Sequence, residues 1–172
     1  MKTSQGAWLL QSKDQQDEGF TLIELMIVLV IGGILTAIAL PSFLNQASKA
    51  KQVEAKMYLG TLNRAQQSYM LERAQFADSM TQLGVAVPNS LNYSYSIHLD
   101  DDSQYAVHDA ESLNVSLRPY VGVAAIAQSS TGDARVATVL CESKTPQQGE
   151  AEQPVINATS VDCATTTEPV GQ

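Results

Sequence analysis

A run of 21 residues from Phe20 to Leu40, whose only charged member is Glu24, constrains this chain more than any other feature. Thirteen of the 21 are Phe, Leu, Ile or Val, and roughly 20 apolar residues in a helix match the thickness of a bilayer core. Their combined transfer free energy outweighs the cost of about 2.5–3.5 kcal/mol for one charged residue. The run is therefore predicted to be a membrane-spanning helix, and a buried core helix is the alternative.

The segment before this run does not follow the order of an ordinary secretory signal, in which the apolar region precedes the cleavage site. Residues 1–19 are mostly polar and end in Gly19, and the apolar run begins with the next residue, Phe20. Cleavage after Gly19 would leave the hydrophobic helix at the new N-terminus.

Glu24 needs an explanation, because a carboxylate inside a membrane helix is costly and usually marks function. Cleavage after Gly19 would create a positive amine on Phe20, at the positive end of the helix dipole. A carboxylate from the same or a neighbouring helix would relieve that charge. The alternative is that Glu24 extends its side chain to the membrane interface.

The residues Gly19-Phe20-Thr21-Leu22-Ile23-Glu24-Leu25, with Pro41 after the apolar run, resemble the class III leader and N-terminal helix of type IV pilins and pseudopilins. The resemblance implies that a prepilin peptidase cleaves after Gly19 and N-methylates Phe20. It also implies that Glu24 pairs with the amine of Phe20 in an adjacent subunit during assembly. Glu18 precedes the glycine where many members have Lys or Arg.

The resemblance also implies a location and a set of partners. The precursor is expected in the inner membrane as a single-pass protein, with the leader in the cytoplasm and the head outside, and then in an extracellular pilus filament. Lysines are more frequent after the span than before it, so the positive-inside rule points the other way. The expected partners are identical or related pilin subunits, the prepilin peptidase, the assembly machinery of the inner membrane and, before assembly, the lipid bilayer.

A helical pattern continues past Pro41 to about Arg73, so that the helix from Phe20 would be roughly 80 Å long. Gly32, Gly33 and Pro41 are weak points where it would bend or unwind, although the glycines are equally explained as a small-residue packing surface. One stripe of the second half is predicted to pack on a head domain. Its members are Leu44, Ala47, Lys51, Ala55, Tyr58, Leu62, Ala65 and Tyr69.

The rest of the chain predicts a small antiparallel sheet. Residues 76–90 lack a helical period and contain Gly84 and Pro88, which is typical of a loop. Strands are predicted from alternation and turn residues at 93–99, 104–109, 120–127 and 135–142, whereas 111–119 is ambiguous. The fold class is therefore α+β, a long helix packed on an antiparallel sheet as in the pilin fold. The expected segments are 1–19 (leader), 20–40 (transmembrane and filament-core helix), 41–73 (amphipathic helix) and 74–172 (loop, sheet and C-terminal region).

The composition from Lys144 onward is typical of a mobile tail, but the tail contains Cys163. A bond from Cys163 to Cys141 would close a loop of about 23 residues and contribute on the order of 3 kcal/mol. An exported head favours that bond, and it resembles the disulfide-bounded C-terminal loop of many type IV pilins. Two free thiols are the alternative.

Composition argues against several other classes of protein. A formal net charge of −8 is unfavourable for a nucleic-acid groove, and two cysteines cannot complete a four-ligand zinc site. Asp100, Asp101 and Asp102 lack EF-hand spacing, so solvated turn carboxylates are preferred over a calcium site. His98 and His108 have no nucleophile at a supporting spacing. We expect no metal, no cofactor and no enzymatic activity. Three matches to the N-glycosylation pattern, at Asn92, Asn114 and Asn157, are of the kind that arises by chance.

Taken with the resemblance, these features predict a structural pilin subunit that polymerises through its hydrophobic helix into filaments for adhesion, twitching motility and DNA uptake. A minor pilin or a type II secretion pseudopilin shares the whole N-terminal argument. A single-span anchor for a binding or enzymatic head is the third hypothesis, and for it cleavage after Gly19 would be irrelevant.

Overall fold

The computed structural model describes residues 19–129 and 132–170, so the predicted leader up to Glu18 lies outside the described residues. The chain divides into two compact units, Met1–Ser42 and Phe43–Gln172. Helix α1 (Leu22–Arg73) contributes to both. It ends at the predicted residue and begins two residues later than predicted, because the side chain of Thr21 caps its first turn.

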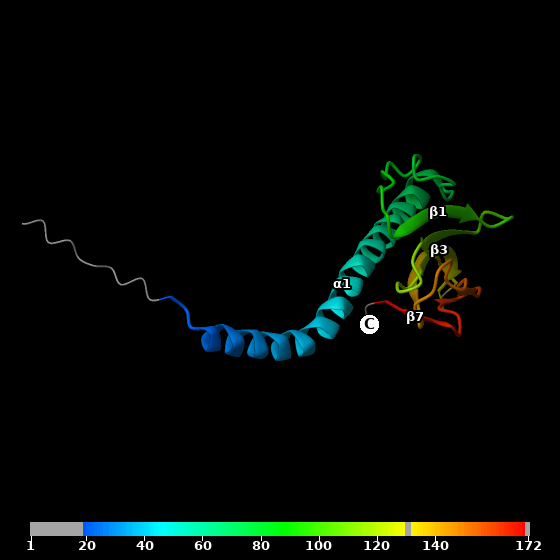
Figure 1. Cartoon of the computed structure of the whole chain (residues 1–172). Helices are drawn as coiled ribbons and strands as arrows, with labels where there is room; N and C mark the ends of the chain where they lie inside the picture. Colours follow the sequence, from blue (N-terminus) through cyan, green and yellow to red (C-terminus); the bar gives the residue numbers. More distant parts are fainter. Residues whose placement is uncertain (1–18, 130–131, 171–172) are drawn as a thin grey trace, which may run out of the picture. The chain divides into compact units, whose positions relative to one another are not determined.

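The second unit contains a five-stranded antiparallel sheet in the order β1-β2-β3-β4-β7 (Figure 1). A separate two-stranded sheet pairs β5 with β6. The strands of the larger sheet are β1 (Tyr93–Leu99), β2 (Tyr105–Ser112), β3 (Tyr120–Gln128), β4 (Ala134–Ser143) and β7 (Thr167–Pro169). The smaller sheet contains β5 (Val155–Ile156) and β6 (Val161–Asp162).

The α+β fold class is confirmed, with corrections to the sheet. Strand β1 has the predicted bounds, whereas β2 runs on to Ser112 through part of the ambiguous segment. The predicted sheet of four strands was wrong, because β7 adds a fifth by pairing with the last three residues of β4. A strand of three residues has no detectable alternation, so only its pairing partner defines it.

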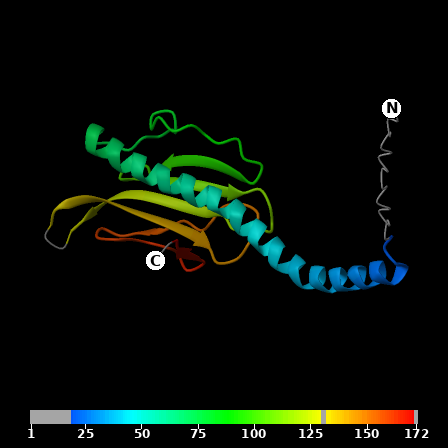
Figure 2. The same ribbon diagram turned by 90° about the vertical axis from the view of Figure 1, so that its left-hand side faces the viewer.

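Helix α1 covers one face of the sheet within the second unit (Figure 2). The predicted stripe was partly wrong: Ala55 and Leu62 are buried, but the rest of the buried face consists of Leu59, Asn63 and Gln66. Hydrophobic periodicity does not find the two polar residues. Both atoms of the Gln66 amide bond to the backbone of Ala77, and Nδ2 of Asn63 donates to the carbonyl of Val139. The core cluster on this face joins Ala55, Leu59 and Leu62 to Met80, Tyr93, Ala110, Leu117 and Tyr120.

The opposite face of the sheet is covered by the C-terminal segment. Val107, Val121 and Val123 pack there with Ala151 and partly buried side chains of β5 and β6. The central strands β2 and β3 are therefore buried on both faces, which is why β3 is an almost continuous apolar run.

Candidate functional site

The first unit exposes a long apolar surface on α1. Every Phe, Leu, Ile, Val and Met side chain from Phe20 to Leu40 is at least half exposed, from 52% for Ile27 to 85% for Phe20. By length and composition this helix is able to cross a membrane. A contiguous apolar surface of this extent is unstable in water and requires lipid or protein around it.

Glu24 lies in the first turn of α1 and forms a reciprocal capping pair with Thr21. The Glu24 carboxylate accepts hydrogen bonds from the backbone N–H of Thr21 at 2.9 Å and from its hydroxyl at 2.7 Å. The backbone N–H of Glu24 donates to Thr21 Oγ1 at 3.3 Å. This is a capping box, which satisfies two helix N-terminal groups. Within one chain, therefore, the carboxylate of Glu24 is already hydrogen-bonded to Thr21.

Gly19 and Phe20 precede the helix and are both exposed. A backbone that is exposed and outside regular structure is the usual substrate geometry for a peptidase. The predicted cleavage position therefore lies in accessible backbone, and the amine that cleavage would create on Phe20 is one residue from the Thr21–Glu24 capping pair.

Sequence reasoning did not identify Thr21, although its signal was present. The pattern Thr21-x-x-Glu24 directly before an apolar run is typical of a helix start.

Pro41, Gly32 and Gly33 all lie inside α1, which is helical through all three positions. The hydroxyl of Thr36 donates to the carbonyl of Gly32 at 2.7 Å. No atom lies within 4 Å of the position that a Cβ would take on Gly32 or Gly33, so the backbone is uncovered at both glycines.

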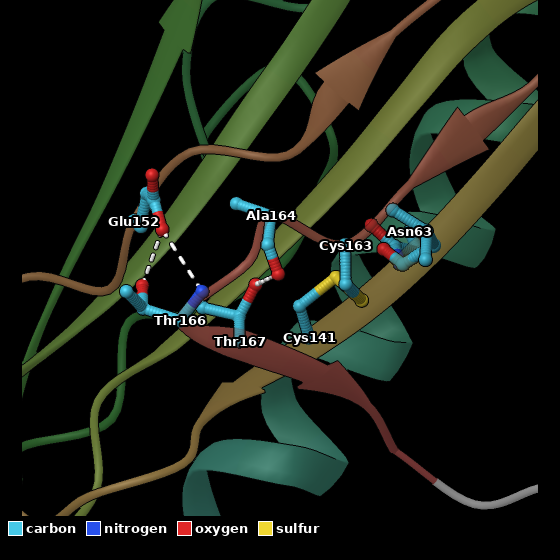
Figure 3. Close-up of a disulfide and its surroundings, with 8 residues drawn as sticks. Asn63, Cys141, Glu152, Cys163, Ala164, Thr166 and Thr167 are labelled. Atoms are coloured by element: carbon cyan, nitrogen blue, oxygen red, sulfur yellow. Dashed lines mark hydrogen bonds between the residues drawn. A yellow bond between two sulfur atoms is a disulfide. The ribbon is translucent and has the colours of Figure 1, made fainter.

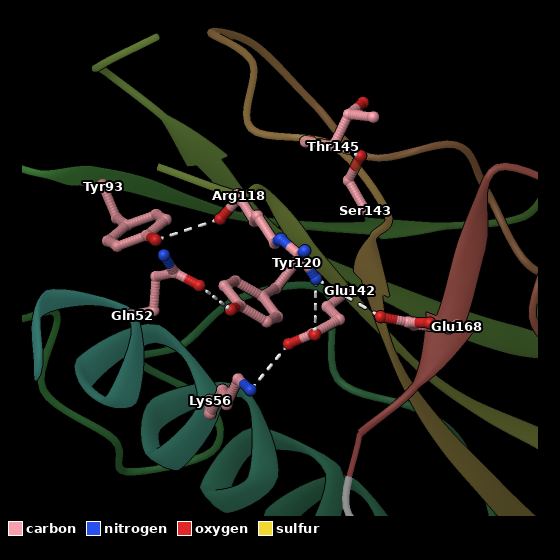
Figure 4. Close-up of polar contacts among 9 residues, drawn as sticks. All are labelled: Gln52, Lys56, Tyr93, Arg118, Tyr120, Glu142, Ser143, Thr145 and Glu168. Carbon is pink, nitrogen blue, oxygen red and sulfur yellow. Dashed lines mark hydrogen bonds and ion pairs between the residues drawn. The ribbon is translucent and has the colours of Figure 1, made fainter. Parts of the chain in front are cut away.

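A cluster of polar residues joins α1 to the sheet in the second unit (Figure 4). Glu142 on β4 accepts from Lys56 at 2.6 Å and from Arg118 at 3.0 Å, and Arg118 also donates to Glu168 at 3.3 Å. Burial alone would raise the pKa of Glu142, but the contacts with Lys56 and Arg118 lower it below its ordinary value. Glu142 is therefore ionised and fixes both cations in place.

The C-terminal region is tied to the sheet by a disulfide between Cys141 and Cys163, with Cα atoms 5.7 Å apart (Figure 3). The fully buried Cys141 lies on β4. Nearby, the carboxylate of Glu152 accepts from the backbone N–H of Thr166 at 3.1 Å and also from its hydroxyl. The segment that resembles a mobile tail by composition is therefore held by a covalent bond, by hydrogen bonds and by strand pairing.

Neither the histidines nor the acidic turn belongs to a metal-binding group in the part of the chain that the structure describes. His108 is fully buried on β2, and exposed His98 lies 3.7 Å from the carboxylate of Asp109. Within residues 19–129 and 132–170, no group of three His, Cys, Asp or Glu side chains is placed to hold a metal ion.

Comparison with known families gives two matches. Residues 52–164, well over half of the chain, match the family described as "Type IV pilin-like G and H". Residues 15–40 match the "Prokaryotic N-terminal methylation motif". The second match includes Gly19, Phe20 and Glu24.

Relatives with similar sequences point the same way. The chain is 43% identical over 82 residues to the type IV major pilin protein PilA of Myxococcus xanthus. The aligned residues cover 48% of this chain and 37% of the relative. It is 41% identical over 73 residues to the type IV major pilin protein PilE1 of Neisseria gonorrhoeae, 42% of this chain and 44% of the relative. It is 32% identical over 105 residues to a fimbrial protein of Pseudomonas aeruginosa, 61% of this chain and 68% of the relative. The chain thus spans less than half the length of the first two relatives.

Proposed function

The chain belongs to the type IV pilin family, and from that premise we propose that it is the structural subunit of a surface filament, polymerising through its N-terminal hydrophobic helix. The observation that carries the proposal is the apolar surface from Phe20 to Leu40, exposed along its whole length. In the precursor, lipid covers this surface. In the filament, the same surface of neighbouring subunits covers it.

The exchange of lipid for protein costs little, because lipid tails and apolar side chains are similarly apolar. For the same reason, burial alone does not fix the register of the helices. We propose that the register comes from Glu24, whose carboxylate leaves Thr21 and pairs with the amine of Phe20 in the adjacent subunit. A buried ion pair of this kind specifies a position more than it adds stability.

The maturation steps follow from the same residues. The peptidase cleaves after Gly19, Phe20 is N-methylated, and Pro41 serves in assembly near the end of the first unit. The precursor is a single-pass protein of the inner membrane with the leader in the cytoplasm and the head outside. The methylation motif that matches residues 15–40 supports this maturation.

The proposed roles of the filament are surface adhesion, twitching motility and DNA uptake, driven by an assembly machinery in the inner membrane. The relatives named major pilins favour an abundant subunit over the second candidate, a minor pilin or secretion pseudopilin. The family consists of structural proteins, which argues against the single-span anchor with an enzymatic head.

The test is to shear surface filaments from cells, image them by electron microscopy and determine the N-terminus of their subunits by mass spectrometry. The expected subunit begins with methylated Phe20 and is the major component of the fibres. A functional protein that still begins with Met1 would contradict the proposed maturation, and a chain absent from long fibres would favour the pseudopilin.

A further inference from the structure

The second unit carries an open groove of about 1030 Å³ between the first turns of its helix and the end of the sheet. Lys49, Gln52 and Lys56 line it from α1. Arg118 lines it from the β2–β3 connection, and Glu142 lines it from β4. Figure 4 shows most of these side chains around the ion pairs of Glu142.

The groove is cationic on a strongly acidic chain. Three cations, Lys49, Lys56 and Arg118, line it against one carboxylate, Glu142, and the neighbouring Glu168 reduces the excess to one positive charge. The whole chain has a formal net charge of −8. Lys56 and Arg118 are paired with Glu142 and Glu168, so the excess positive charge of the groove is that of Lys49, which is exposed. The groove therefore suits an anionic occupant.

An acidic turn projects from the other end of the same sheet. It connects β1 to β2, and Leu99 at its base belongs to the cluster that includes Met70, near the end of α1. The groove, in contrast, contains Lys49 and lies beside the connection that follows Ser112 at the far end of β2. The eight residues of β2 separate the two features by roughly 26 Å at about 3.3 Å per residue.

The turn has a defined conformation. The side chain of Asp100 accepts from the backbone N–H of Tyr105 at 2.9 Å, and the N–H of Ser103 donates to the carbonyl of Asp100 at 3.0 Å. Ser103 takes a left-handed conformation with φ 54°. Asp101 and Asp102 are exposed at the tip. Two carboxylates on a fixed turn require little ordering when they bind.

We propose that Asp101 and Asp102 of one copy dock into the cationic groove of the next copy, as a contact between heads that sets their spacing. The two surfaces differ and lie at opposite ends of the head, so the contact is heterologous and propagates into an open assembly. This inference rests on the proposed filament function, and the acidic turn supplies charge complementary to the groove.

Crosslinking within filaments tests the contact. Full-length chain carrying Lys49→Cys and Asp101→Cys is expressed in cells, and sheared filaments are treated with a short bismaleimide. A ladder of multimers is expected, because each subunit contacts two neighbours. The matched control combines Asp101→Cys with Lys51→Cys, an exposed lysine two residues further along α1 that does not line the groove, and should give no ladder. Filaments without a ladder in the first variant would overturn the contact and leave the filament function standing.

Charge exchange gives a second, independent test. Lys49→Glu and the pair Asp101→Lys with Asp102→Lys should each lower the yield of sheared filaments roughly tenfold, because each places like charges together. The combined exchange should restore the yield, and Lys51→Glu should leave it unchanged. A loss with Lys49→Glu that the exchange does not restore would overturn the proposal in favour of another anion, such as a lipid phosphate. An unsubstituted chain that forms no filaments would overturn the proposed function and the contact together.

Discussion

Gly122 on β3 lies so close to Asn63 on α1 that a Cβ at position 122 would be 2.9 Å from Asn63 Oδ1. The amide of Asn63 is itself fixed, because its Nδ2 donates to the carbonyl of Val139 at 2.9 Å. The helix therefore approaches the sheet at a position where a side chain would collide with a hydrogen-bonded amide.

The substitution Gly122→Ala is expected to lower the free energy of unfolding by about 1–3 kcal/mol, the usual cost of overpacking. Asn63→Ala should also destabilise, because it removes the hydrogen bond that Nδ2 of this buried amide donates to the carbonyl of Val139. Together the two should cost less than their sum, since the alanine at 63 makes room for the new methyl group. Urea unfolding of the full chain in detergent measures all three variants. Strict additivity would show that the two positions do not contact each other.

The close contact of Gly122 with Asn63 is of a kind that the sequence does not predict, because it joins distant segments of the chain. The alternation of Tyr93, Tyr95 and Ile97 predicts β1 with its observed bounds, because one face of that strand is more buried than the other. Gln66 is fully buried although it breaks the apolar period, because it forms two hydrogen bonds with the backbone of Ala77. That pairing depends on where the chain returns after α1, which no local pattern encodes.

The candidate assembly site was more predictable than the head, because its parts are contiguous. The roles of Gly19, Phe20 and Glu24 were predicted from a contiguous motif and its resemblance to pilins, and they stay predictions, whereas the capping role of Thr21 was missed. The groove beside Lys49 was not predicted, since it combines α1 with the β2–β3 connection and the end of β4. The cysteine pair was a hypothesis with an alternative, because spacing alone does not distinguish a bond from two thiols.

Substitutions at Glu24 separate its capping role from its proposed charge role. Glu24→Gln keeps a side-chain acceptor for Thr21 but removes the negative charge, and Glu24→Ala removes both. We expect both variants to insert in the membrane and both to lose efficient filament formation, because neither can pair with the amine of Phe20. Membrane fractionation and the yield of sheared filaments are the measurements.

The matched control for Glu24 is Thr21→Val, which removes the hydroxyl of the capping pair and retains the carboxylate. The yield of sheared filaments from this variant should be nearly normal. Normal filaments from Glu24→Gln would show that hydrogen bonding, and not charge, is what assembly requires at this position.

Asp109 should make the head less stable at neutral pH than at pH 4. Burial, and then repulsion by Glu150, raise the pKa of this carboxyl to about 6, against the opposing effects of His98 and Gln153. The folded protein therefore binds a proton between about pH 4 and pH 6 that the unfolded chain does not, which stabilises it as the pH falls, by on the order of 3 kcal/mol. Asp109→Asn should raise the free energy of unfolding at pH 7, and the gain should vanish near pH 4. A gain independent of pH would contradict this assignment.

His108 should have the opposite effect on the stability of the head over nearly the same pH range. Burial lowers the pKa of this imidazole to about 4, so its unfavourable protonation costs stability as the pH falls from about 6.5 toward 4. In the unsubstituted chain the effects of His108 and Asp109 oppose each other. His108→Leu should gain stability relative to the unsubstituted chain on acidification, as measured by unfolding at pH 7 and pH 4. A constant difference between the two proteins would show that the histidine does not titrate in this range.

Replacing both Cys141 and Cys163 by alanine should lower the free energy of unfolding by on the order of 3 kcal/mol, the entropy of the opened loop. Strand β7 should lose its protection from amide hydrogen exchange before β1 does, because β7 pairs only through three residues of β4. Alkylation of the unreduced full chain gives a direct check: uptake of two equivalents of reagent would mean that the thiols are free.

The bond from Cys141 to Cys163 has a further consequence for the proposed filament subunit. Outside the cell, no ATP-driven chaperone would refold a C-terminal end that a pulling force had frayed. Because the chain is closed covalently at Cys163, peeling of the last strand stops after a few residues and reverses when the load is released. In the proposed filament, recovery of a frayed C-terminal end would then rely on a bond that forms once, after the head has left the reducing cytoplasm.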